Sequence, residues 1–152
     1  MVRKASLAAA CAAIVLTGSL PAFADDAAPS VAQDFQMKRC VNMGNALEAP
    51  NGAPWGRLYS EADYARIAEA GFDTVRIPIR WSDYTGPAPT YRIHPDFAEV
   101  VDNNVRWALK NDLNIVLNIH HFEEIMEQPE SQMERYRAIW DQISLRLSLI
   151  HI

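Results

Sequence analysis

From about Met37 onward, short apolar segments alternate with longer segments in which apolar residues recur at helical spacing. The apolar segments predict strands over residues 39–43, 74–77 and 114–119. The longer segments predict helices that begin near Ser60, Pro95 and Ser131. A loop rich in polar or aromatic residues separates each strand from its helix. This order predicts parallel βα units in an α/β fold.

The spacing of the strands indicates which α/β architecture they build. The strand centres at Val41, Val75 and Val116 are 34 and 41 residues apart, which is the pace of a (β/α)8 TIM barrel. Eight such units need roughly 250 residues. The chain is therefore predicted to hold about the first three βα units of a TIM barrel.

Residues 1–24 have the pattern of a cleaved export signal. Basic residues at positions 3–4 precede a small apolar stretch, and Ala22-Phe23-Ala24 supplies the small residues that a signal peptidase reads. An uncleaved membrane anchor is the alternative, although the apolar run is shorter than the ~20 residues that span a bilayer. Residues 25–36 predict a flexible leader. We expect a secreted protein, extracellular or periplasmic, with no membrane attachment after cleavage.

Composition narrows the classes of partner. The 152 residues include 14 Lys or Arg and 19 Asp or Glu, and 49% are hydrophobic, so one core is expected and a nucleic acid partner is not. Cys11 lies in the predicted signal, which leaves Cys40 as the single thiol of the mature chain. Cys40 is predicted to be a small buried hydrophobic residue. The sequence gives no signal for the oligomeric state.

Arg76 is the most informative residue of the predicted strands. Since Val75 and Ile77 should face the covering helices, strand alternation sends Arg76 toward the barrel interior. A guanidinium is costly there unless a carboxylate receives it. Arg76 is therefore interpreted as a residue that orients a catalytic carboxylate. The alternative is a structural ion pair with Glu48 or Asp83.

The third predicted strand ends in polar residues. Asn118 and His120 share its inward face, which predicts hydrogen bonds to a polar ligand. A metal site with His120, His121 and Glu123 as ligands is the alternative. Because neighbouring strand residues point to opposite faces, this alternative requires His121 to lie already in the loop.

Aromatic residues follow the first two predicted strands. Trp55, Trp81 and Tyr84 lie in loops just past strand ends, where together they predict stacking platforms for the apolar faces of sugar rings. Ordinary loop packing is the alternative for each of them. Trp107 and Trp140 fall within predicted helices and are expected to belong to the core.

Three segments resemble glycoside hydrolase family 5, the cellulase-type retaining β-glycanases with a TIM-barrel fold. These segments are residues 41–49, 71–78 and 116–121, and the resemblance spans about residues 37–146. It implies that Arg76 hydrogen-bonds the catalytic nucleophile and that His120 lies near the bond that is cut. It implies substrate contacts for Asn45, Trp55 and His121. It implies no cofactor.

The family's chemistry uses two glutamates about 5 Å apart, one as acid/base and one as nucleophile. In the family the first follows an asparagine at the end of strand four, and the second ends strand seven. The sequence contains no Asn-Glu pair, and Glu123 and Glu124 follow strand three. We therefore expect a chain that is truncated before both glutamates and inactive by itself. Residues 147–152 are interpreted as a candidate non-native tail.

The resemblance implies a secreted glycosidase that hydrolyses a β-linked polysaccharide or oligosaccharide. An endo-β-1,4-glucanase of cellulase type is the first choice, and a β-mannanase or β-1,3-glucanase of the same family is an alternative. A non-catalytic carbohydrate-binding or interaction protein is a second class, and a metal-dependent barrel hydrolase is a third. A downstream Asn-Glu pair favours the glycosidase, whereas loss of activity with a chelator favours the metal enzyme.

Overall fold

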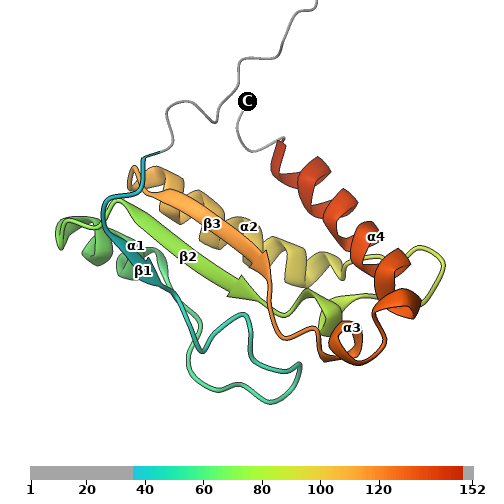
Figure 1. Cartoon of the computed structure of the whole chain (residues 1–152). Coiled ribbons are helices and arrows are strands. Elements are labelled where there is room, and N and C mark those ends of the chain that lie inside the picture. Colours follow the sequence, from blue (N-terminus) through green and yellow to red (C-terminus); the bar gives the residue numbers. More distant parts are fainter. Residues whose placement is uncertain (1–35, 149–152) are drawn as a thin grey trace, which may run out of the picture. The chain divides into compact units, whose positions relative to one another are not determined.

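The computed structural model of the chain describes residues 36–148 (Figure 1). The strands are β1 Cys40–Asn42, β2 Thr74–Ile79 and β3 Asn114–Ile119. The helices are α1 Glu61–Glu69, the 3-10 helix η2 Trp81–Tyr84, α2 Pro95–Lys110, α3 Glu123–Glu127 and α4 Pro129–Ser148. The predicted export signal, nearly all of the predicted leader, and residues 149–152 lie outside the described residues. Among residues 36–148, no helix is both long and apolar enough to cross a membrane.

The three strands form one parallel sheet in the order β1-β2-β3. Val41 pairs with Val75, and Val75 pairs with Ile115 on the other side. The order of the strands in the sheet follows the order in the chain, and a helix lies in each connection (Figure 1). The predicted parallel βα units are therefore confirmed, and they correspond to the start of a (β/α)8 barrel.

The first helix begins and ends where its sequence signals predict. The backbone N–H of Ser60 donates to the carboxylate of Asp63 at 2.8 Å. Arg57 donates two hydrogen bonds to the same carboxylate, at 2.7 and 2.6 Å, and they hold the pKa of Asp63 well below its ordinary value. Gly71 follows the helix with a φ of 82°, a left-handed conformation that costs glycine little.

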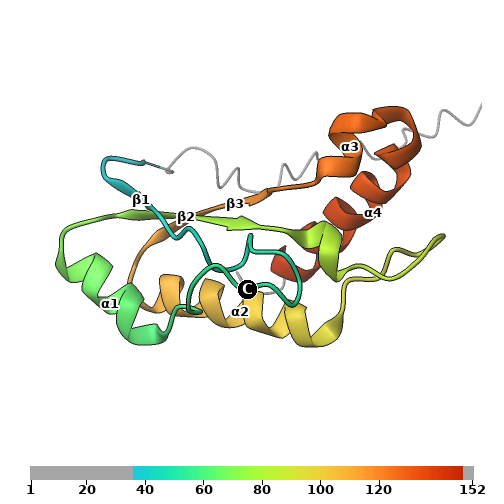
Figure 2. The same ribbon diagram turned by 90° about the horizontal axis from the view of Figure 1, so that it is seen from below.

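The two faces of the sheet have different surroundings. Figure 2 shows α1 and α2 on one side of the sheet, while no helix covers most of the other side. Val75, Ile77 and Ile79 are at most 1% exposed and pack in the core on the helix side. Arg76 lies between two of them in the strand and is only partly buried. Because alternate strand residues point to opposite faces, Arg76 projects from the face without helices, as predicted.

The last helix is attached to α2 by polar contacts as well as by its apolar side. Arg146 of α4 donates two hydrogen bonds to Asp102 of α2, at 2.8 and 2.6 Å. Gln142 accepts from the backbone N–H of Ile93 at 2.9 Å, just before α2 begins. Ile139 of α4 is fully buried in the core. These contacts hold α4 against α2 and the segment just before it.

Four details differ from the sequence-based expectations. The segment predicted as a loop after the third strand contains α3, and α4 begins at Pro129 because the residue before a proline disfavours the helical conformation. The second strand extends to Ile79. Cys40 is exposed rather than buried, since it lies in the short edge strand β1. Trp107 and Trp140 pack against the core but are only partly buried.

The unpaired edges of the sheet lead us to expect that the isolated 152-residue chain associates and lacks a cooperative fold. Within the described residues, β1 and β3 each leave one strand edge unpaired, and unpaired edges promote association between chains. We expect the purified chain to bind a hydrophobic dye and to unfold without a sharp cooperative transition. Dye fluorescence, sedimentation and a thermal melt test this expectation. A reversible, cooperative melt of a monomer would contradict it.

Candidate active site

Several of the predicted site residues lie on the open face of the sheet or in the loops that follow the three strands. Arg76 of β2 donates from Nη1 to Oδ1 of Asn42 in β1, at 2.5 Å. These two residues are direct partners in the parallel register, so they lie side by side on the open face. No ion pair joins Arg76 to Glu48 or Asp83 within residues 36–148. The charge of Arg76 is therefore available to a group that approaches this face.

His120 follows β3 directly and lies beside this arginine charge. Its backbone N–H donates to the carbonyl of Ile79 at 2.8 Å, which fixes it at the end of the sheet. Burial lowers the pKa of the His120 imidazole, and the charges of His121 and Arg76 lower it further. The lowered pKa favours the neutral form of the ring. A neutral imidazole can donate one hydrogen bond and accept another, which suits a hydroxyl-rich ligand.

Two of the predicted substrate-contacting residues have left-handed backbones. His121 has a φ of 54° and Asn45 has a φ of 61°. This conformation is uncommon for residues other than glycine, and it often marks a functional site. His121 thus lies in the loop rather than in the strand, and its ring approaches that of His120, with 4.2 Å between the centroids. Both histidines are consequently directed to one region.

The metal alternative required this position of His121, but its set of ligands does not form. The only link between His121 and Glu123 that has ion-pair geometry is a 3.6 Å approach of Nδ1 to a carboxylate oxygen. Among residues 36–148, no three His, Cys, Asp or Glu side chains converge as a metal site would require. The described residues therefore give the metal alternative no support.

Trp55 completes one wall of the site from the loop after β1. Its ring meets the ring of His121 edge to face, with centroids 5.3 Å apart, and it remains 49% exposed. The loop is fastened at its far end, where the hydroxyl of Tyr59 donates to the carbonyl of Gly44 at 2.8 Å. An exposed indole next to an imidazole can stack against the apolar face of a sugar.

Trp81 and Tyr84 were predicted to stack against substrate, and the structure places them elsewhere. Trp81 is only 2% exposed and packs edge to face on Phe97 of α2, at 5.9 Å. The ring of Tyr84 stacks on Phe97, at 3.6 Å. The helix η2 turns the chain away from the open face, so both rings join the packing on the helix side. Trp81 is too buried to offer a stacking surface in this structure, whereas Tyr84 is only partly buried and its predicted contact with substrate stays a prediction.

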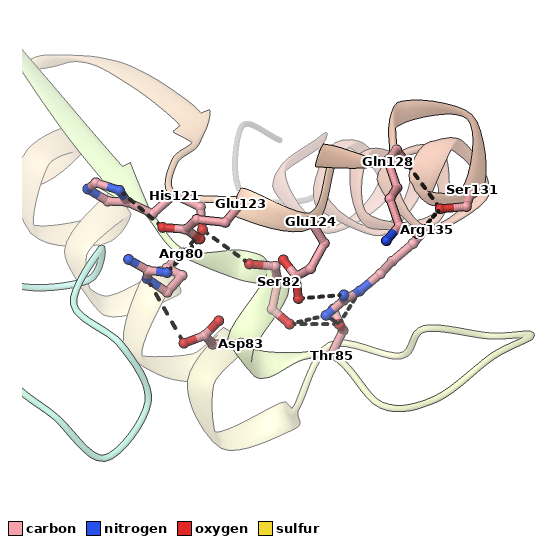
Figure 3. A network of polar contacts seen from close by, with 10 residues as sticks. All are labelled: Arg80, Ser82, Asp83, Thr85, His121, Glu123, Glu124, Gln128, Ser131 and Arg135. Atoms are coloured by element: carbon pink, nitrogen blue, oxygen red, sulfur yellow. Dashed lines mark hydrogen bonds and ion pairs between the residues drawn. The ribbon is translucent and has the colours of Figure 1, made fainter. Parts of the chain in front are cut away.

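Two residues of the site were missed as functional candidates in the sequence. Glu48 is buried and accepts hydrogen bonds from the backbone N–H groups of Asn45 and Ala46, at 2.6 and 3.1 Å. Arg80 is also buried, and it contacts the loop after β1. Figure 3 shows its contact with Glu123 in the segment after β3. The signal for Arg80 was a charged residue directly after an apolar strand, whereas Arg76 was identified by strand alternation.

The arrangement is suited to binding and orientation. It offers a guanidinium, a neutral imidazole, a second imidazole and an exposed indole on one rim. The buried carboxylate of Glu48 is occupied by backbone donors, and Glu123 and Asp83 lie near Arg80. General acid catalysis and nucleophilic attack at a glycoside need two further carboxylates about 5 Å apart.

Comparison with protein families gives a match to the model for cellulase, glycosyl hydrolase family 5, over residues 32–148. Endoglucanase H of Acetivibrio thermocellus is 34% identical over 122 residues, which cover 78% of this chain and 14% of that protein. A xyloglucan-specific endo-beta-1,4-glucanase of Bacteroides ovatus is 33% identical, with 72% of this chain and 25% of that protein covered. The chain thus spans a minor part of these relatives.

Solved structures that are similar to this chain also include enzymes of cellulase type. A mutant form of Cel5A from Thermotoga maritima, in complex with cellobiose, is 47% identical with a TM-score of 0.70, and the match covers 72% of this chain and 38% of that one. The cellulose synthase subunit Z of Clostridioides difficile is 48% identical with a TM-score of 0.70, and the match covers 73% and 36%. The described residues therefore match about a third of each solved chain.

Proposed function

Because the chain belongs to glycosyl hydrolase family 5, the cellulase family, we propose that it forms the amino-terminal part of a secreted, retaining endo-β-1,4-glucanase. Members of this family are glycosidases with a TIM-barrel fold. The substrate, the stereochemistry and the export of the whole protein are what we propose. Residues 1–24 would direct export and be removed before Asp25.

The position of Arg76 carries this proposal. Its guanidinium lies on the open face, is oriented by Asn42, and has no carboxylate partner within residues 36–148. In a closed barrel this face becomes the interior, where an arginine needs an acidic partner. A nucleophilic glutamate from a later strand would supply that partner. Arg76 would then keep the glutamate ionised and aimed at the anomeric carbon.

The other rim residues would hold the sugar. Neutral His120 would exchange hydrogen bonds with hydroxyl groups at the subsite next to the cleaved bond, and its burial keeps it uncharged there. Asn45 and His121 would contribute hydrogen bonds from their fixed loop positions. Trp55 would stack on a sugar ring. These groups bind and orient substrate, while the two glutamates would perform the bond-making steps.

β-1,4-Glucan is the substrate we propose first. The similar proteins are chiefly endoglucanases, and Cel5A of Thermotoga maritima has been solved with cellobiose. The same enzyme has also been solved with mannotriose, which favours β-1,4-mannan as the second candidate. A panel of carboxymethylcellulose, mannan and xyloglucan would rank these substrates by kcat/KM.

Stereochemistry tests the proposed mechanism directly. Two carboxyl groups about 5 Å apart leave no room for a water at the anomeric carbon, so the reaction proceeds through a covalent glycosyl-enzyme and two inversions. We expect the protein encoded by the complete gene, purified from the culture medium, to release the β-anomer first from a β-linked substrate. Proton NMR of the fresh product measures this. Initial appearance of the α-anomer would contradict a retaining mechanism.

A further inference from the structure

Arg80 joins all three strand-end loops of the site. It follows β2, its side chain is 9% exposed, and its donors reach in two directions (Figure 3). Nε donates to the backbone carbonyl of Glu48 in the loop after β1, at 3.0 Å. Nη1 donates to the backbone carbonyl of His121, at 3.2 Å, and to the carboxylate of Glu123, at 2.8 Å.

Two of these contacts lead to residues in a left-handed conformation, one indirectly and one directly. On one side, Arg80 holds Glu48, and the carboxylate of Glu48 in turn accepts from the backbone N–H of Asn45. On the other side, Arg80 binds the carbonyl of His121 itself. Such conformations are energetically unfavourable for residues other than glycine and persist only where surrounding contacts enforce them. One guanidinium is therefore common to the contacts around both strained positions.

Arg80 also lies against the aromatic wall of the site. Its guanidinium carbon is 5.8 Å from the ring centroid of Trp55, and the same indole meets His121 edge to face. A planar guanidinium can hold several acceptors and an aromatic ring at once, which a lysine ammonium cannot do. The surroundings of Arg80 thus require arginine rather than any cation.

We propose that Arg80 is a positioning residue that holds Asn45, Trp55 and His121 in the arrangement that receives substrate. It acts through these residues and does not itself touch the reacting atoms. The proposal rests on the proposed function, because it assigns a role within the same glycan-binding site. It adds a residue whose effect should fall on substrate binding rather than on the chemistry of the glutamates.

The test uses a complete barrel that contains this chain. Residues 36–148 are joined to the remaining βα units of Thermotoga maritima Cel5A, and the product is called the complete-barrel chimera. Arg80→Met removes the donors, and Arg80→Lys keeps the charge. Arg135→Met is the matched control, since Arg135 also links the loop after β2 to α3, through Thr85 and Glu124, but contacts none of the three proposed wall residues.

We expect both Arg80 variants to lower kcat/KM on cello-oligosaccharides by about 10-fold to 100-fold, chiefly through KM. Arg80→Lys should not restore the parent value. The Arg135→Met variant should keep kcat/KM within about twofold of the parent, even if its melting temperature falls. The indole N–H signal of Trp55 in a two-dimensional NMR spectrum should shift in the Arg80 variants and stay in place in the control.

Two results would overturn the positioning role. One is an Arg80→Lys variant with the parent KM and an unchanged Trp55 signal. The other is a loss of melting temperature in both Arg80 variants with no change in KM, which would make Arg80 purely structural. The proposed function is judged separately, on the activity of the unsubstituted chimera, whereas the Trp55 signal reports on Arg80 whether or not the chimera turns over.

Discussion

The complete-barrel chimera is expected to hydrolyse carboxymethylcellulose, whereas the 152-residue chain is expected to release no reducing sugar above background. The difference is expected because the two catalytic glutamates of the family follow strands four and seven, whereas residues 36–148 contain three strands. Binding groups alone leave most of the barrier in place. Reducing-sugar assays on both proteins, purified in parallel, measure the contrast.

The chimera also shows whether residues 36–148 are compatible with a family barrel. Sequence identity of 47% with Cel5A over the matched part favours correct closure of the strands. Its control is a chimera that lacks β1, made by starting the same chain at residue 60. Activity of the isolated 152-residue chain, retained through purification to homogeneity, would contradict the role proposed for it. A folded but inactive chimera would contradict the proposed function.

Arg76→Ala in the complete-barrel chimera is expected to reduce kcat by roughly 100-fold or more, comparable to the loss of one preorganised charged donor at other active sites. The variant would leave the nucleophilic carboxylate without its partner in the barrel interior, so its pKa would rise and part of it would be protonated at neutral pH. The activity profile should therefore shift to higher pH. Steady-state kinetics from pH 5 to 9 test both expectations.

The matched control for this substitution is Arg106→Ala, because Arg106 lies on the exposed side of α2 and contacts only Asn103 by a side-chain hydrogen bond. It should leave kcat and the pH profile unchanged. A melting curve for each variant separates loss of fold from loss of function. Normal turnover by a folded Arg76→Ala protein would show that this arginine is structural and that its assignment to catalysis is wrong.

The residues that local rules govern were predictable from the sequence. Strand alternation placed Arg76 opposite Val75 and Ile77, and the serine and aspartate spacing located the start of α1, because both signals depend on neighbours in the chain. The histidines were located by their place after β3. These features define most of the fold and the polar part of the site.

The surroundings of other strand-end residues depend on contacts between distant segments, which a local sequence pattern does not reveal. Trp81 and Tyr84 follow a strand end as a binding residue would, but Phe97 of α2 offers them a packing partner that no local pattern reveals. Arg80 has its partners 32 to 43 residues away, in the loops after β1 and β3. Long-range packing thus decided which polar and aromatic residues near a strand end reach the rim.

Because successive side chains of β2 point to opposite faces of the sheet, substitutions at neighbouring positions affect different properties of the protein. Val75 and Ile77 must fit the space beneath the helices. Exchanges among aliphatic residues at these positions therefore change the stability and leave the substrate preference unchanged. At Arg76, on the opposite face, the charge and polarity of the neighbouring groups decide which residue is tolerated. Laboratory evolution of this chain can therefore be directed to one property at a time, with stability sought at odd-numbered positions of β2 and specificity sought in the loops that follow the strands.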